Sequence, residues 1–164
     1  MILSSESRQP LPANPEPRRA WRTWLAAERV SAGLAVLGVA VASYLTVIHY
    51  RRELLVCGAG DCASVQQSSY AEIAGIPVAA FGLAMYLAVF ALTIVRWLHP
   101  PAHELATIVT FALVLSGALY AAYLTYIELW VIDAICQWCV ISALITLGLF
   151  ISEARIIIRL LRNA

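Results

Sequence analysis

The sequence predicts an all-α integral membrane protein: a four-transmembrane-helix bundle with a short helix in the first outer loop. Hydrophobic residues make up 62% of the 164-residue chain and charged residues only 13%, which is too apolar for a soluble domain. Mean hydropathy is +0.80. Four apolar stretches are long enough to cross a bilayer, which takes about 20 residues each. They run from about Val30 to His49, Ile76 to Val95, Leu105 to Tyr126 and Cys136 to Ile151.

The segment before the first span, residues 1–29, is predicted to be a disordered cytoplasmic tail. It is polar and holds four of the seven prolines. No small-residue cleavage site closes the first apolar run, so that run is predicted to be a retained span and not a signal peptide. Residues 30–152 then form the membrane domain, and residues 153–164 form a cytoplasmic C-terminal tail.

The arginines predict the orientation of the spans. All 11 basic residues are arginine, and only Arg51 and Arg52 lie on the side of the membrane opposite the other nine. The positive-inside rule therefore places both termini in the cytoplasm and the 51–76 and 127–135 loops outside. No Asp, Glu, Arg or Lys lies deep inside a span, which argues against an ion pump. No nucleic-acid-binding signature is present, so nucleic acid is not expected as a partner.

The first outer loop carries signals for a short helix after residue 68. Ser69 and Glu72 match the S-x-x-E capping box, with Gly75 as a stop and Pro77 just beyond. This pattern predicts a helix that lies over the outer end of the bundle.

The four cysteines form two close pairs, Cys57 with Cys62 and Cys136 with Cys139, and both pairs fall on the outward side, where disulfides persist. Spacing alone allows three disulfide connectivities. Cys136 opens a predicted helix and Cys139 follows one turn later. Unpaired N–H groups and the helix dipole favour a thiolate at such a helix start.

The first pair brackets two glycines, Gly58 and Gly60, which predict a mobile turn. Such a loop could reach both a soluble partner and the second cysteine pair. Two structural disulfides are the plainer alternative, although short loops remove little entropy from the unfolded chain. A zinc site built from all four cysteines is another alternative, but no histidine lies near the second pair in sequence. We favour redox cysteines and expect no metal.

Several motifs follow one another in a fixed order. A loop cysteine pair comes after the first span, followed by the Cys62–Ser69 segment, the Gly75-Ile76-Pro77 to Phe81-Gly82 stretch, and Cys136-Gln-Trp-Cys139 at the fourth span. The combination, over residues 30–152, resembles the vitamin K epoxide reductase family in its bacterial form. The DsbB-type family also has four spans and two outer pairs, but its close pair comes first.

The resemblance implies a thiol:quinone oxidoreductase of the bacterial inner membrane that generates disulfides for a thiol protein. The electron acceptor would be a quinone, ubiquinone or menaquinone. Many relatives carry a fused thioredoxin-like domain after a further span. This sequence has none, so we expect a separate thioredoxin-fold (DsbA-like) partner. The alternative function is a non-catalytic membrane scaffold or a metal-binding protein with structural cysteines.

The resemblance also implies roles for individual residues. Cys57, Cys62, Cys136 and Cys139 are the expected catalytic residues. Cys57 would meet the partner, Cys62 would attack Cys136, and Cys139 would face the quinone. Ser68 and Cys139 are the expected quinone-binding residues.

Two positions favour quinone reduction over vitamin K epoxide reduction. A tyrosine and an asparagine of the animal enzymes correspond to Ala143 and Val78 in this sequence.

Overall fold

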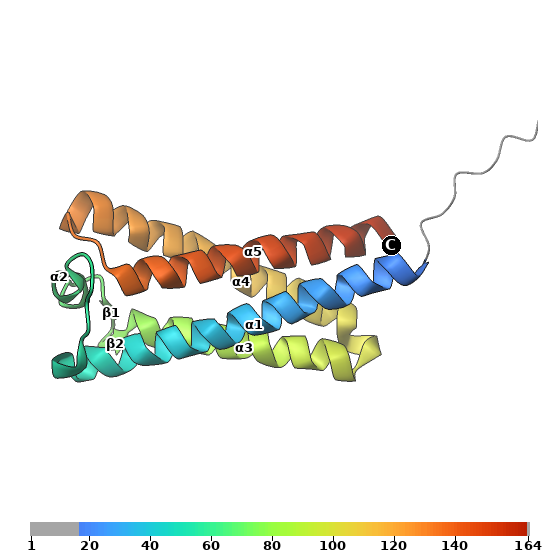
Figure 1. The fold of residues 1–164 in the computed structure, drawn as a ribbon, viewed down its shortest axis with the longest axis horizontal. Helices are drawn as coiled ribbons and strands as arrows, with labels where there is room; N and C mark the ends of the chain where they lie inside the picture. Colours follow the sequence, from blue (N-terminus) through green and yellow to red (C-terminus); the bar gives the residue numbers. More distant parts are fainter. Residues whose placement is uncertain (1–16, 164) are drawn as a thin grey trace, which may run out of the picture.

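The computed structural model describes residues 17–163, and within them four helices are long and apolar enough to cross a membrane. These are α1 (Pro17–Tyr50), α3 (Val78–Leu98), α4 (His103–Ile127) and α5 (Gln137–Asn163). The predicted class, an all-α four-helix membrane bundle, is confirmed. The start of α1 and the end of α5 lie at one end of the bundle, and the cysteine-bearing loops lie at the other (Figure 1).

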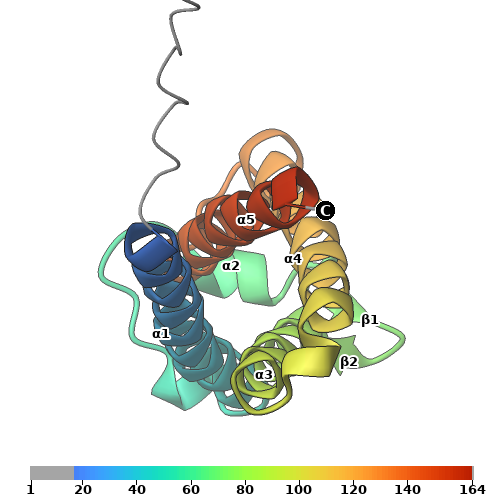
Figure 2. The same ribbon diagram turned by 90° about the vertical axis from the view of Figure 1, so that its right-hand side faces the viewer.

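The four helices close into a ring. Helix α1 packs against α3 and α5, and α4 packs against the same two helices, as the end-on view in Figure 2 shows. Small residues allow the close approach, because a Cβ added to Gly38 would overlap the ring of Tyr86. The Tyr86 hydroxyl also lies 2.8 Å from Thr146 Oγ1 and 3.1 Å from Ser142 Oγ, so hydrogen bonds join α3 to α5 inside the bundle.

Helices α1 and α5 extend beyond the spans that the sequence predicted. The expected tail boundary near residue 29 falls inside α1, and α5 continues through the expected C-terminal tail to Asn163. Residues 1–16 of the predicted tail lie outside the described residues. The added helical turns are rich in Ala, Leu, Arg and Glu, which have high helix propensity and continue a helix begun in the membrane.

The short helix of the first outer loop is present, but its predicted position was wrong. Helix α2 spans Cys62–Gln66 and follows a short 3₁₀ turn at Arg52–Leu54. The Asp61 carboxylate caps α2 by accepting the Ser64 N–H at 3.1 Å.

The predicted helix after residue 68 is replaced by a hairpin. Strands β1 (Glu72–Ile73) and β2 (Ile76–Pro77) pair in antiparallel fashion across Ala74 and Gly75, whose φ angles of 52° and 79° suit a type I′ turn. Glu72, the expected capping residue, instead lies 2.9 Å from His49 Nε2.

A buried ion pair joins α3 to α5 at the bundle end opposite the cysteines. Arg96 Nη2 lies 2.7 Å from Glu153 Oε2, Nη1 lies 3.4 Å from Oε1, and both side chains are fully buried. The two-pronged geometry suits a guanidinium and a carboxylate. Each charge depends on the other, because removing one partner leaves the second buried without compensation.

We expect Glu153→Gln to lower the free energy of unfolding by about 3–5 kcal/mol, since it leaves the buried Arg96 charge uncompensated. Thermal unfolding of the purified protein in detergent measures this loss. Arg155→Met on the same helix is the control: Arg155 is exposed, and the change should stay within about 0.5 kcal/mol. Equal stability of the two variants would contradict the ion-pair account.

Candidate functional site

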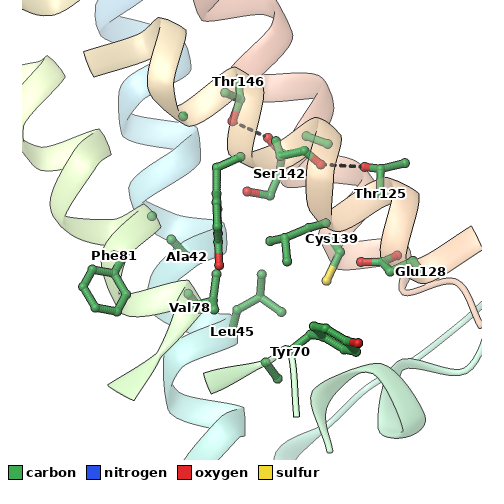
Figure 3. Close-up of a pocket in the computed structure, with 18 of the residues that line it drawn as sticks. Ala42, Leu45, Tyr70, Val78, Phe81, Thr125, Glu128, Cys139, Ser142 and Thr146 are labelled. Atoms are coloured by element: carbon green, nitrogen blue, oxygen red, sulfur yellow. Dashed lines mark hydrogen bonds between the residues drawn. The ribbon is translucent and has the colours of Figure 1, made fainter. Parts of the chain in front are cut away.

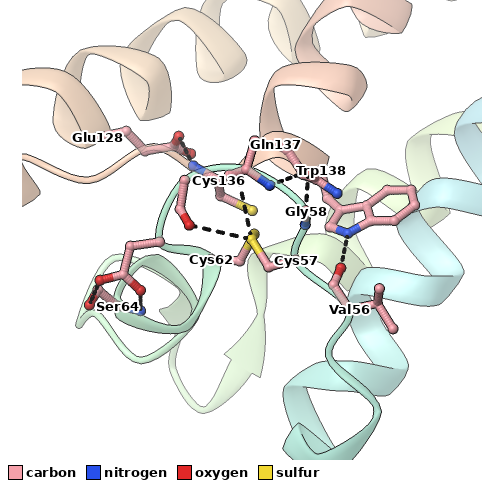
Figure 4. Close-up of a disulfide and its surroundings, with 12 residues drawn as sticks. Val56, Cys57, Gly58, Cys62, Ser64, Glu128, Cys136, Gln137 and Trp138 are labelled. Atoms are coloured by element: carbon pink, nitrogen blue, oxygen red, sulfur yellow. Dashed lines mark hydrogen bonds between the residues drawn. A yellow bond between two sulfur atoms is a disulfide. The ribbon is translucent and has the colours of Figure 1, made fainter.

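The loop cysteines Cys57 and Cys62 lie beside Cys136 of the second pair (Figure 4). Cys57 and Cys62 form a disulfide with their Cα atoms 6.1 Å apart, and Cys136 and Cys139 are free thiols. Cys62 and Cys136 are both buried and belong to one cluster with Val65, whereas Cys57 is exposed. The fold therefore packs one cysteine of each pair together and leaves Cys57 facing outward.

The loop that carries the first pair is docked on the start of α5. Gly60 and Cys136 form an isolated antiparallel β-bridge. The side-chain oxygen of Gln137 accepts hydrogen bonds from the backbone N–H groups of Gly58 at 3.1 Å and Ala59 at 2.8 Å. Gln137 directly follows Cys136 in the C-x2-C motif, so a residue within this motif binds the loop that carries the first cysteine pair.

The glycines of this loop, which we expected to supply mobility, also permit close approach. Gly60 has φ +81°, and an added Cβ would overlap the Ile135 carbonyl oxygen. That same carbonyl accepts the Asp61 N–H at 3.0 Å. Gly60 is therefore the contact point between the loop and the chain leading into α5.

An aromatic pair holds the start of the loop. The indole N–H of Trp138 donates to the Val56 carbonyl at 2.8 Å, and the Tyr44 hydroxyl accepts the Val56 N–H at 2.9 Å. The rings of Tyr44 and Trp138 lie with their centroids 4.7 Å apart. These contacts fix the backbone immediately before Cys57.

Cys136 occupies the N-cap position of α5, which begins at Gln137. Its sulfur accepts hydrogen bonds from the Cys139 thiol and from the backbone N–H groups of Cys139 and Trp138. These hydrogen bonds, led by the one from the Cys139 thiol, outweigh burial and lower the pKa of Cys136 from 9.0 to about 7. Cys136 is therefore the thiol of this pair that is prepared to carry negative charge.

We expect the Cys136 thiolate to form through pH values near 7 in a Cys57→Ser/Cys62→Ser variant, because the lowered pKa favours the charged form at lower pH. Ultraviolet absorbance of the thiolate, followed against pH, measures this transition. Adding Cys139→Ala removes the leading hydrogen-bond donor and should raise the pKa of Cys136. An unchanged midpoint in that variant would contradict the assigned cause.

A carboxylate that we did not predict as a site residue lies beside the second pair. Glu128 is only 7% exposed, and its Oε2 accepts the Cys136 backbone N–H at 3.2 Å. Its carboxylate also lies beside the Cys139 thiol. One sequence feature could have indicated Glu128 as a site residue: it is an acidic residue at the end of an apolar span, shortly before C-x2-C. The π-helical turn that follows it was not readable from the sequence.

Cys139 lines a cavity of about 360 Å³ that lies between the four long helices and the first outer loop (Figure 3). That volume lies in the range of about 300–1,000 Å³ common for small-molecule sites. The lining is largely apolar, with the Glu128 carboxylate and several hydroxyl residues, among them Ser68, Tyr86 and Ser142. A flat conjugated ring with two carbonyl oxygens, such as a quinone, matches an apolar slot with a few hydrogen-bonding groups.

Both residues that we predicted to bind a quinone, Ser68 and Cys139, line this cavity. Ser68 lines it, but its hydroxyl donates to the Val65 carbonyl at 2.8 Å, so only its oxygen lone pairs face a ligand. Val78 and Ala143, the two departures from the animal enzymes, also line the cavity and make it more apolar there. A role for Ser68 in quinone binding stays a prediction.

A membrane bundle that brings a docked loop disulfide, a dithiol at a helix start and an adjoining cavity together defines a class, the membrane thiol oxidoreductases. The family model described as the vitamin K epoxide reductase family matches residues 29–154, and the chain belongs to this family. Its members are oxidoreductases that act on thiols with quinones.

Proposed function

We propose that this protein generates disulfides in a separate thioredoxin-fold (DsbA-like) partner outside the bacterial inner membrane and passes the electrons to ubiquinone or menaquinone. The observation that carries the proposal is the contact between the pairs: buried Cys62 lies against buried Cys136, and Cys139 faces the cavity. A relay needs this order, because each thiol must reach the next sulfur.

The exposed sulfur of Cys57 suits the first step. A thiolate of the reduced partner attacks Cys57, which breaks the Cys57–Cys62 bond and forms a mixed disulfide. The partner's second thiol then displaces Cys57. The partner leaves oxidised, and the loop pair holds two electrons as two thiols.

The buried contact suits the second step. The Cys62 thiolate attacks Cys136 in the Cys136–Cys139 disulfide, and Cys139 leaves with the electron pair of the broken bond. Cys57 then attacks Cys62 and restores the loop disulfide. The products are the oxidised loop pair and the reduced second pair, which is the combination in the structure.

The cavity suits the last step. A quinone bound beside Cys139 accepts two electrons and two protons while Cys136 and Cys139 re-form their disulfide. The protein contributes proximity and an apolar enclosure. The arginine distribution supports an outward position of the cysteines, since nine of the 11 lie on the opposite side.

The test is quinone reduction by the purified protein with a reduced thioredoxin-fold donor. The proposal expects quinol formation that depends on both the donor and the protein, and the donor should become oxidised in equal amount. If the donor stays reduced when the protein and a quinone are both present, that result would contradict the proposal and favour the scaffold alternative. Reporter fusions at Ala164 and an insertion at Gly60 test the orientation, with the first expected inside and the second outside.

A further inference from the structure

Glu128 is an acidic group held between the second cysteine pair and the cavity. Its carboxylate accepts the Cys136 N–H, lies near the Cys139 thiol and lines the same cavity as Cys139. Figure 3 shows it beside Cys139, with Tyr70 of the outer loop across from them. Within residues 17–163 it makes no ion pair, so no cation offsets its charge.

The local backbone is shaped to present this side chain. Helix α4 passes directly into a π-helical turn, η3 (Glu128–Ile132), which ends at Asp133 in the left-handed region at φ +53°. Single π-turns of this kind are rare and occur often at functional sites. The Ala134 N–H closes the turn by donating to the Glu128 carbonyl at 3.1 Å.

Burying a carboxylate in an apolar setting without a cation costs free energy, so a purely structural role does not explain a glutamate at this position. A glutamine would accept the same Cys136 N–H without the charge. What glutamate adds is the ability to take up and release a proton beside Cys139.

The hydrogen bonds of Cys136 and Cys139 indicate that a proton acceptor is needed beside Cys139. The Cys136 sulfur is the one that the backbone N–H groups at the start of α5 stabilise, whereas the Cys139 thiol is the hydrogen-bond donor of the pair. The Cys139 thiol lies within hydrogen-bonding reach of the Cys136 sulfur and the Glu128 carboxylate. To form a disulfide again, Cys139 must lose this proton.

We propose that Glu128 is the catalytic proton acceptor for Cys139 and delivers that proton to the quinone, an inference that rests on the proposed function. The Cys139 S–H bond breaks and the proton passes to the Glu128 carboxylate. The Cys136–Cys139 bond forms and two electrons pass to the quinone. One proton of the quinol comes from Glu128 and the second comes from water, which took the Cys136 proton when its thiolate formed, so two thiols and a quinone yield a disulfide and a quinol.

Other titratable groups around Glu128 are placed less well for this role. Cys136 and Cys139 are the reacting thiols, and Cys62 of α2 is in the disulfide. Tyr70 and Asp133 are exposed, and Tyr120 lies further along the cavity wall on α4. Glu128 is the carboxylate in contact with Cys139.

The test is a single-turnover reaction of the pre-reduced protein with decylubiquinone, a short-chain quinone. Glu128→Gln keeps the shape and a hydrogen-bond acceptor for the Cys136 N–H but cannot take the proton. We expect quinol formation to slow by at least about 100-fold, within the range of about 10²–10⁴-fold for general acid–base catalysis. The rate should also lose its rise with pH and its solvent isotope effect.

Electron transfer from Cys57 and Cys62 to the second pair, measured by thiol trapping, should stay within about twofold of the unchanged protein. Asp133→Asn is the matched control, since it neutralises the exposed neighbouring carboxylate and should leave both rates unchanged. Glu128→Gln that reduces quinone at the normal rate, or that slows both steps equally, overturns the proposal. No quinol from the unchanged protein overturns the proposed function itself.

Discussion

A Cys139→Ser variant is expected to lose quinone reduction down to the uncatalysed background and to accumulate a Cys62–Cys136 disulfide. Without Cys139, the second pair cannot close and has no sulfur at the cavity. Cys136 still has its N-cap position and the backbone N–H groups that stabilise its thiolate, and it lies against Cys62 in the buried cluster. It therefore attacks the loop disulfide at Cys62 and displaces Cys57, and the new bond persists once the freed Cys57 thiol is blocked by alkylation, because no other resolving thiol follows.

Mass spectrometry after proteolysis without reductant identifies the trapped bond. Cys57→Ser is the companion variant: it should lose exchange with the protein partner but still accept electrons from a small dithiol at the second pair. A trapped Cys57–Cys136 bond in Cys139→Ser would reverse the roles within the loop pair.

Gly60→Ala should slow electron transfer between the pairs by at least about tenfold. An added methyl group meets the Ile135 carbonyl, and the left-handed backbone costs an L-residue about 1–2 kcal/mol. A loss of 1.4 kcal/mol in the docked population is about tenfold in rate when docking precedes exchange. Thiol trapping after mixing with a reduced partner measures the interpair step.

Gly75→Ala separates docking from backbone strain. Gly75 has nearly the same φ, +79°, but an added Cβ there meets nothing within 4 Å. It should carry the strain of the Gly60 variant without the clash, and its interpair rate should remain close to normal. Equal slowing in the two variants would contradict the docking account.

The spans were predicted well from the sequence, because a long apolar run can be recognised without knowing any contact between distant residues. It also predicted the two cysteine pairs and their shared end of the bundle, since an even number of spans and the loop lengths decide that arrangement. The ends of α1 and α5 were less predictable, because helix-favouring residues continue past the apolar stretch.

Other features depend on contacts between residues far apart in the chain. The capping pattern at Ser69 and Glu72 predicted a helix, but Glu72 bonds to His49 and the segment turns as a hairpin. The sequence alone could not predict that the Gln137 side chain binds the Cys57–Cys62 loop, because the two lie far apart in the chain. The position of Glu128 beside Cys139 depends on a π-turn that has no simple sequence signature.

In the proposed relay, electrons reach Cys136 and Cys139 from Cys57 and Cys62 and leave through them to the quinone. Anaerobic mixing of fully reduced protein with excess quinone, with quinol counted per protein, tests it most directly. Four thiols hold electrons for two quinols, so the unchanged protein should form two. A Cys57→Ser/Cys62→Ser variant should form one, and a Cys136→Ser/Cys139→Ser variant none. Quinol from the last variant, or none from the first two proteins, would contradict the claim.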